Sequence, residues 1–183
     1  DNLSSIIIPT NITSIGDGAF SDCGQLSSVT WHNGVTSIGA SAFMGSAIKN
    51  TAISGGQLAN ALILPSSLQT IGASAFEKAA DIVGTITFPA TLQTLGDRAF
   101  FDCDGITSIS FANGSIITEI GEQCFENSGR LAGTIAFPDS IQRICADAFR
   151  YCTSLVGISF NKETSNLTVI EEGAFNECTG MTC

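Results

Sequence analysis

The hexapeptide Ile15-Gly16-Asp17-Gly18-Ala19-Phe20 recurs seven times as an aliphatic residue, usually glycine, two variable positions, usually alanine, and phenylalanine. The copies end at the anchor phenylalanines Phe20, Phe43, Phe76, Phe100, Phe125, Phe149 and Phe175, which are 23, 33, 24, 25, 24 and 26 residues apart. A period of this length is typical of a solenoid, in which each repeat packs only on its neighbours. We therefore expect residues 1–183 to form one domain of about seven repeats, truncated or continuing at both ends.

A second pattern begins six residues after most anchors and is represented by Leu26-Ser-Ser-Val29-Thr-Trp31. Its alternation of apolar and small polar residues predicts a half-buried β-strand. All four prolines directly follow such a run, where a strand can end without losing a ladder hydrogen bond: Pro9, Pro65, Pro89 and Pro138. An apolar pair spaced by three follows, such as Ile12 and Ile15, and we expect it to enter the core from the opposite side. The anchor segment is then expected to close the coil as a short helical turn.

The aromatic residues follow the same two patterns. Seven of the twelve phenylalanines are anchors, and four occupy the last core position of a strand: Phe88, Phe111, Phe137 and Phe160. Trp31 takes that position in its own repeat. Stacked repeats would place these rings in two continuous spines, so we interpret them as core and not as a platform for ligands.

Composition excludes some partners. The net charge of −10 repels nucleic acid phosphates and anionic membrane surfaces. No apolar run approaches the roughly 18 residues that a membrane span needs. We therefore expect neither nucleic acid binding nor membrane insertion of this segment.

The repeat resembles that of the BspA-like leucine-rich repeat family, whose motif is close to L-x-x-I-x-I-P-x-x-V-x-x-I-G-x-x-A-F-x-x-C. Ten positions of the first copy match: Leu3, Ile6, Ile8, Pro9, Ile12, Ile15, Gly16, Ala19, Phe20 and Cys23. The resemblance extends over essentially the whole chain. The departures are local: Cys145 and Glu171 replace the glycine, Cys124 replaces the alanine, and Ser46, Ala79 and Ser128 replace the cysteine.

This resemblance implies an α/β leucine-rich repeat solenoid, a right-handed coil with a parallel β-sheet on one face and short helical turns or irregular segments on the other. It also implies a protein of the cell surface or the extracellular space, of a class regarded as adhesins or host-interaction proteins. It assigns no binding residue.

The cysteines and the only histidine are expected to be structural. Four of the seven cysteines occupy the motif's cysteine position, Cys23, Cys103, Cys152 and Cys178, and we interpret them as buried thiols. A disulfide between Cys152 and Cys178, which lie in adjacent repeats, remains open. The absence of a Cys-x-x-Cys pair argues against zinc, and His32 stands at a strand end without a nucleophile beside it. We expect no catalytic residue, metal or cofactor.

The acidic residues concentrate in the anchor segments, which contain eleven of the seventeen: Asp17, Asp22, Glu77, Asp97, Asp102, Glu122, Glu126, Asp147, Glu171, Glu172 and Glu177. We expect a solvated negative flank, since such surfaces resist aggregation. Calcium binding is the alternative, although no acidic loop has the close spacing of an EF-hand.

Two regions are candidate interaction sites. The outward strand positions are small and uncharged, and they include Ser28, Thr30, Thr85, Thr87, Ser108, Ser110, Thr134 and Ser159. The second repeat contains nine extra residues within Gly45–Gln57, including Lys49 and Asn50, which could form a recognition loop. The alternatives there are a neutral loop or an aborted coil, because Ile48, Thr51 and Ile53 imitate the strand spacing.

The sequence thus predicts a non-enzymatic binding module, secreted or on the cell surface, for a protein or a glycan of unknown identity. The alternative is a structural spacer that presents another domain and has no ligand. Self-association through uncapped ends is a further possibility, because solenoids need polar caps for solubility.

Overall fold

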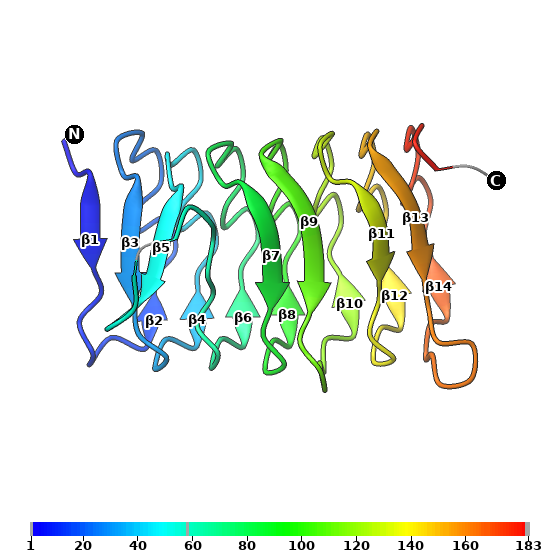
Figure 1. The fold of residues 1–183 in the computed structure, drawn as a ribbon, viewed down its shortest axis with the longest axis horizontal. Helices are drawn as coiled ribbons and strands as arrows, with labels where there is room; N and C mark the ends of the chain where they lie inside the picture. Colours follow the sequence, from blue (N-terminus) through cyan, green and yellow to red (C-terminus); the bar gives the residue numbers. More distant parts are fainter. Residues whose placement is uncertain (1, 58, 182–183) are drawn as a thin grey trace.

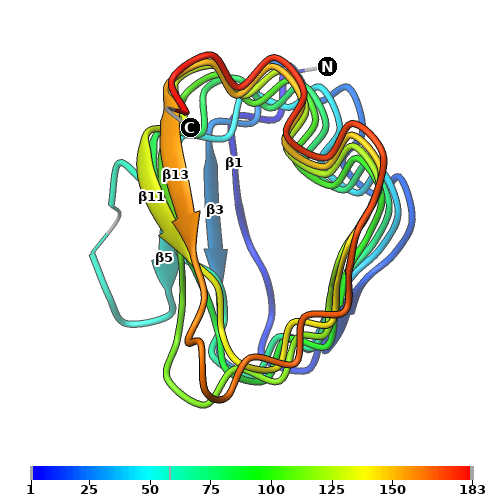
Figure 2. The same cartoon turned by 90° about the vertical axis from the view of Figure 1, so that its right-hand side faces the viewer.

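The computed structural model describes residues 2–57 and 59–181, and this part of the chain forms fourteen strands and no helix. Seven longer strands line one side, the strand face: β1 (Ser5–Ile7), β3 (Ser28–Trp31), β5 (Asn50–Ile53), β7 (Gly84–Phe88), β9 (Ile106–Phe111), β11 (Gly133–Ala136) and β13 (Leu155–Ser159). Seven two-residue strands line the side behind them: β2 (Ser14–Ile15), β4 (Ser37–Ile38), β6 (Thr70–Ile71), β8 (Thr94–Leu95), β10 (Glu119–Ile120), β12 (Arg143–Ile144) and β14 (Val169–Ile170). The coils succeed one another along one axis (Figure 1) and superpose in the view along it (Figure 2).

All pairings between named strands are parallel. The strand face consists of three ladders, β1-β3-β5, β7-β9 and β11-β13, and the opposite side of two, β2-β4-β6-β8 and β10-β12-β14. Within β3, Val29 and Trp31 are buried, whereas Ser28 and Thr30 retain exposed surface. The alternation in the sequence therefore identified the inward and outward sides of this strand.

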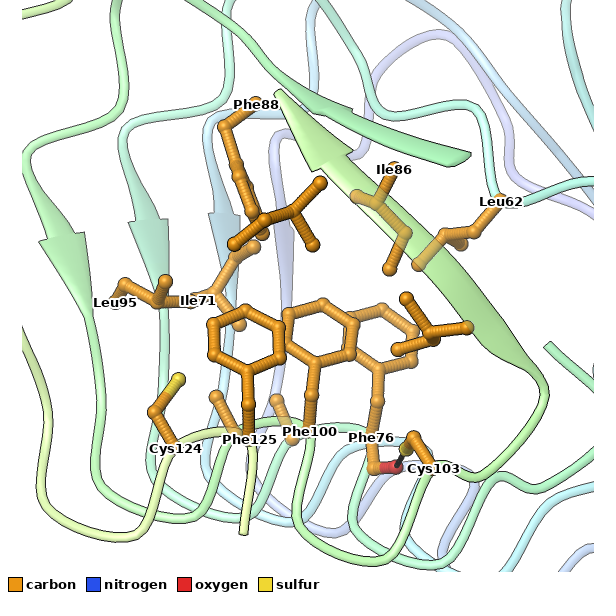
Figure 3. Packing of buried hydrophobic residues seen from close by; sticks show 14 of the residues in the cluster. Leu62, Ile71, Phe76, Ile86, Phe88, Leu95, Phe100, Cys103, Cys124 and Phe125 are labelled. Atoms are coloured by element: carbon orange, nitrogen blue, oxygen red, sulfur yellow. Dashed lines mark hydrogen bonds between the residues drawn. The ribbon is translucent and has the colours of Figure 1, made fainter. Parts of the chain in front are cut away.

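The anchor phenylalanines form one column of stacked rings. Centroids of consecutive rings are separated by 5.2 Å from Phe20 to Phe43 and by 5.1–5.5 Å along the rest of the column. Their planes deviate from parallel by between 1° and 14°. The five inner rings are fully buried, and Figure 3 shows three of them, Phe76, Phe100 and Phe125, lying face to face. The predicted first spine is confirmed.

The second spine is continuous only in the C-terminal part of the chain. Phe88, Phe111, Phe137 and Phe160 follow one another at 5.5, 6.0 and 5.2 Å. Trp31 instead packs edge-on against an anchor ring, at 6.0 Å from Phe43. The spine is interrupted between Trp31 and Phe88 because the intervening repeat carries aliphatic residues at this level.

The expected helical turns at the anchor segments are wrong. Each coil has two left-handed residues, one two positions before the anchor and one two positions after it: Gly18, Ser41, Ser74, Arg98, Gln123, Asp147 and Gly173, then Asp22, Gly45, Lys78, Asp102, Asn127, Tyr151 and Glu177. A left-handed residue breaks a right-handed helical turn, and outside glycine it is unfavourable by roughly 1–2 kcal/mol. Hydrogen bonds to the next coil offset this, for example from the N–H of Phe20 to the carbonyl of Ala42 at 2.7 Å.

In the central coils the motif glycine allows close packing between neighbouring coils. A Cβ atom on Gly72 would lie 2.6 Å from the backbone nitrogen of Ala40 in the preceding coil, and one on Gly96 would lie 2.6 Å from that of Ala73. Gly16 belongs to the first coil and has open space at the same place. The glycine of the repeat is therefore explained by contact and not by a positive φ.

Candidate binding surface

The predicted outward residues of the strand face lie where the pattern placed them. Thr85 is opposite Ser108 and Thr87 is opposite Ser110 across the β7-β9 ladder. The hydroxyl oxygens of Thr87 and Ser110 are 2.9 Å apart. Thr134 and Ser159 are exposed on the next ladder, and Ser28 and Thr30 are half-buried on β3. The structure thus arranges these hydroxyl groups in rows, and their role in binding stays a prediction.

Exposed apolar side chains interrupt this hydroxylated surface in places. Ile7 on β1 is 73% exposed and Val156 on β13 is 54% exposed. The exposure of Ile7 follows from the alternation of its strand. The exposure of Val156 does not, because the β11-β13 pairing contains an irregularity between Gly133 and Thr134 that displaces the register there.

Residues 50–53 of the insertion in the second repeat form a strand. β5 pairs with β3 in register, placing Asn50 opposite Ser28 and Thr51 opposite Val29. The predicted aborted coil is therefore confirmed for residues 50–53. Lys49 is exposed immediately before this strand, and the following residues project beyond the strand face (Figure 2).

The predicted strand of the third repeat falls on the stretch 58–64, of which residue 58 lies outside the described residues. Leu62 and Leu64 are buried as the alternation requires, but no strand is formed at residues 59–64. The space beside β3 is already occupied by β5. Ala59 instead forms an isolated antiparallel bridge with Thr51, through two backbone hydrogen bonds of 3.0 and 3.2 Å. Residues 61–64 are held by side chains, which are described below.

The cysteine position has a hydrogen-bonding role. The thiols of Cys103, Cys152 and Cys178 donate to the carbonyls of the preceding coil's anchors, Phe76, Phe125 and Phe149, at 3.0, 3.2 and 3.0 Å. Figure 3 shows the first of these bonds. Ser128 makes the equivalent, longer contact to Phe100 at 3.5 Å. Ala79 stands at the same position without a donor, and the buried Ser46 hydroxyl has no partner, so the position requires a small side chain and accommodates a donor.

Burial makes these thiols unreactive. Cys103, Cys124 and Cys152 are buried, and burial raises the pKa of each well above its ordinary value. Cys152 and Cys178 are both free, so the alternative of a disulfide between them is not realised. Cys183 lies outside the described residues.

His32 has a structural position. Its Nδ1 accepts a hydrogen bond from the backbone N–H of Gly34 at 2.9 Å, which leaves Nε2 as the protonated nitrogen. Nε2 lies 3.0 Å from the carbonyl oxygens of both Pro9 and Ile12 in the preceding coil. Both ring nitrogens therefore have backbone partners, and neither is directed at a nucleophile.

Some carboxylates of the acidic flank accept hydrogen bonds from backbone N–H groups. Asp17 and Asp97 each accept a hydrogen bond at 2.8 Å from an N–H of the next coil, that of Ala40 and that of Glu122. Such contacts tie consecutive coils together. Within residues 2–57 and 59–181, no three His, Cys, Asp or Glu side chains are grouped as a metal site would need.

A partly buried charged cluster, Glu77, Arg98, Phe101, Gln123 and Glu126, occupies the middle of this flank. Arg98 binds both oxygens of Glu77 at 2.9 and 3.1 Å, donates to Gln123 at 2.9 Å, and lies 3.7 Å from the ring centroid of Phe101. The hydrogen bonds from Arg98 lower the pKa of Glu77. Burial, with the nearby Asp147, raises the pKa of Glu126. The cluster explains why Phe101 stands outside both ring patterns.

The described residues form no helix that is long and apolar enough to cross a bilayer. The sequence pattern described as the BspA type leucine-rich repeat region matches residues 1–60 and 56–182, with six copies. The chain belongs to the BspA-type leucine-rich repeat family. No curated protein matches the sequence.

Solved structures similar to this BspA-type chain are bacterial leucine-rich repeat proteins. One from Bacteroides ovatus is 25% identical with a TM-score of 0.74, over 91% of this chain and 39% of its own length. The T. pallidum leucine-rich repeat protein is 24% identical with a TM-score of 0.81, and the match covers 100% of this chain and 79% of that protein. The pneumococcal vaccine antigen PcpA is 24% identical with a TM-score of 0.71, and the match covers 89% of this chain and 42% of that protein. The chain therefore spans well under half of the first and third of these proteins, and the last two likenesses show the fold alone.

Proposed function

We propose that the chain is a non-enzymatic binding module of a cell-surface or secreted protein, which holds a protein or glycan of a host on its strand face. The observation that carries the proposal is the separation of two surfaces. The strand face presents hydroxyl groups and a projecting insertion, whereas the acidic residues gather at the anchor segments. The family and the neighbours, which include a vaccine antigen, support an exposed location.

The charge distribution supports the strand face as the contact surface. Residues 23–76, which include β3, β5 and the insertion, contain no aspartate or glutamate, and Lys49 is their only lysine or arginine. A ligand approaching this part of the face therefore meets little of the repulsion that a net charge of −10 imposes elsewhere.

A structural spacer is the second candidate, and the ring column favours it. An uninterrupted stack of seven rings gives a stiff rod, which would hold another domain at a fixed distance without binding anything itself.

The test is a binding screen of the purified chain against extracellular-matrix proteins and a glycan array. Two variants are compared with it, one in which residues 54–60 are replaced by Asn-Gly and a matched control in which residues 161–166 are shortened in the same way. The proposal predicts a ligand whose binding is lost in the first variant and kept in the control. If the chain binds neither a matrix protein nor a glycan, the result favours the structural spacer.

A further inference from the structure

The sheet of the strand face is open between β5 and β7. β5 ends the first ladder and β7 begins the second. Residues 61–64 pass between them, and within the described residues no backbone hydrogen bond joins residues 59–65 to β7. This break in the sheet coincides with the insertion, and Figure 1 shows the connecting segment running between the two strands.

The segment 61–64 is bound on one side only, and there by side chains. Thr51, which is fully buried, accepts a hydrogen bond from the N–H of Ile63 at 2.6 Å and donates to the carbonyl of Ala61 at 2.9 Å. The indole N–H of Trp31 donates to the carbonyl of Ile63 at 2.7 Å. The carbonyl of Ala61 and both backbone groups of Ile63 therefore point toward β3 and β5.

The facing edge of β7 is also unpaired. The carbonyl of Phe88 accepts a hydrogen bond from Ala112, just after β9, at 2.9 Å. Successive residues of a parallel strand direct their backbone groups to opposite sides. Ile86 and Phe88 therefore bond toward β9, and the N–H and carbonyl groups of Thr85 and Thr87 point into the opening.

The opening contains a hollow of about 280 Å³. It is lined by Ala61, Leu62, Ile63, Leu64, Ser66, Thr85, Thr87 and Pro89, none of them charged. Ile63 is 37% exposed, so the hollow has an apolar wall open to solvent. Its volume is below the roughly 300–1,000 Å³ of sites that enclose a whole small molecule, which suits one side chain of a ligand lying across it.

We propose that the free edge of β7 binds an extended, uncharged peptide segment of a partner protein as an added strand, with one apolar side chain in the hollow. Strand addition to an open edge draws its affinity from backbone hydrogen bonds and its selectivity from pockets for alternate side chains. Both elements are present here. The neutral lining and the absence of acidic residues over 23–76 match an uncharged peptide better than a charged one. The inference rests on the proposed binding function and assigns it a site and a class of partner.

The geometry can be tested first without any ligand. Amide hydrogen exchange of the free protein, read by NMR, should show Thr85 and Thr87 exchanging at least about tenfold faster than Ile86 between them, because only Ile86 bonds to β9. Equal protection of Thr87 and Ile86 means that the edge is closed and overturns the inference, while leaving the broader binding function standing.

The second test uses a phage-displayed library of random 12-residue peptides selected on the wild-type chain. Thr87→Pro removes the N–H that faces the opening without removing a β7-β9 bond, and Thr87→Val keeps that N–H and loses the same hydroxyl. We expect selected peptides to be uncharged with alternating apolar residues, to bind Thr87→Pro about tenfold more weakly, and to bind Thr87→Val as the wild type. Ile63→Asp should also abolish binding, whereas Ile116→Asp, on an exposed residue away from the hollow, should not.

Three results contradict the proposal. One is equal binding of the selected peptides to Thr87→Pro and the wild type, with Ile63→Asp binding as well. Another is the selection of no peptide at all. The third is a glycan or matrix ligand whose binding is unchanged by both substitutions, which would keep the proposed function and move its site elsewhere.

Discussion

Replacing Phe100 by alanine removes the middle ring of the anchor column. Phe100 is fully buried and stacks on Phe76 at 5.1 Å and on Phe125 at 5.5 Å, with Phe88 edge-on at 5.9 Å. Burial of the ring contributes about 2 kcal/mol. The space left behind and the lost ring contacts add about 2 kcal/mol more. We therefore expect the free energy of unfolding to fall by about 4 kcal/mol.

The assay is urea unfolding followed by circular dichroism at 25 °C. With a slope of roughly 2.5 kcal/mol per molar urea, the midpoint should fall by about 1.5 M. Phe101→Ala is the matched control, because it removes the same atoms one residue away from a half-buried ring outside the column. It should lower the stability by about 1 kcal/mol. A loss below about 1 kcal/mol for Phe100→Ala, or one no larger than that of the control, would refute the shared interior.

The remaining predictions concern the contacts between coils. Gly72→Ala should destabilise the chain by about 1–3 kcal/mol, because the new Cβ meets the backbone of Ala40; Gly16→Ala, with open space, should change the stability by less than about 0.5 kcal/mol, and equal effects would contradict the packing explanation. Iodoacetamide at pH 8, followed by mass spectrometry, should label Cys103 and Cys152 only after unfolding, since burial raises their pKa values and hides their thiols; rapid labelling of the native chain would show that the coil edge is open. Arg98→Ala should lower the stability by about 1 kcal/mol at pH 7. Because Arg98 lowers the pKa of Glu77 in the fold, that difference should be present above about pH 5 and shrink as the pH falls through the lowered pKa; a difference that persists unchanged in acid would assign the effect to Phe101 packing.

The sequence predicted the column and the inward residues because both are periodic. An anchor at every repeat specifies a ring at the same place in each coil, and the confirmed stacking follows from that periodicity. The alternation around Val29 likewise identified Ser28 and Thr30 as outward. Prediction succeeded where the same residue type recurs at the same position.

It failed where unlike residues share a backbone conformation. The left-handed positions beside the anchors hold glycine, serine, arginine, aspartate and tyrosine among others, so residue type carries little of the signal. The conformation is imposed by hydrogen bonds from one coil to the next, which single repeats do not show. The close approach at the motif glycine was missed because it too is a contact between two coils.

The candidate site was predictable only in part. Outward hydroxyl groups followed from the strand period, and the spacing of Ile48, Thr51 and Ile53 pointed correctly to the aborted coil. The opening beside β7 could not be predicted, because it depends on two side chains, Thr51 and Trp31, that bind the backbone of a segment following in the chain. Their polar groups at core positions were the available signal. Lys49 and Asn50 have no tested role and stay predictions.

The ring column fixes which residues face the solvent, so its direct observation tests the account most closely. In a chain with selectively labelled phenylalanine, NMR should show contacts between the rings of successive anchors, six in all, at the 5.1–5.5 Å spacing of the structure. The five inner rings should be shielded from a soluble paramagnetic probe. Missing contacts between neighbouring anchors, or inner rings that the probe reaches, would contradict the fold and with it the strand face.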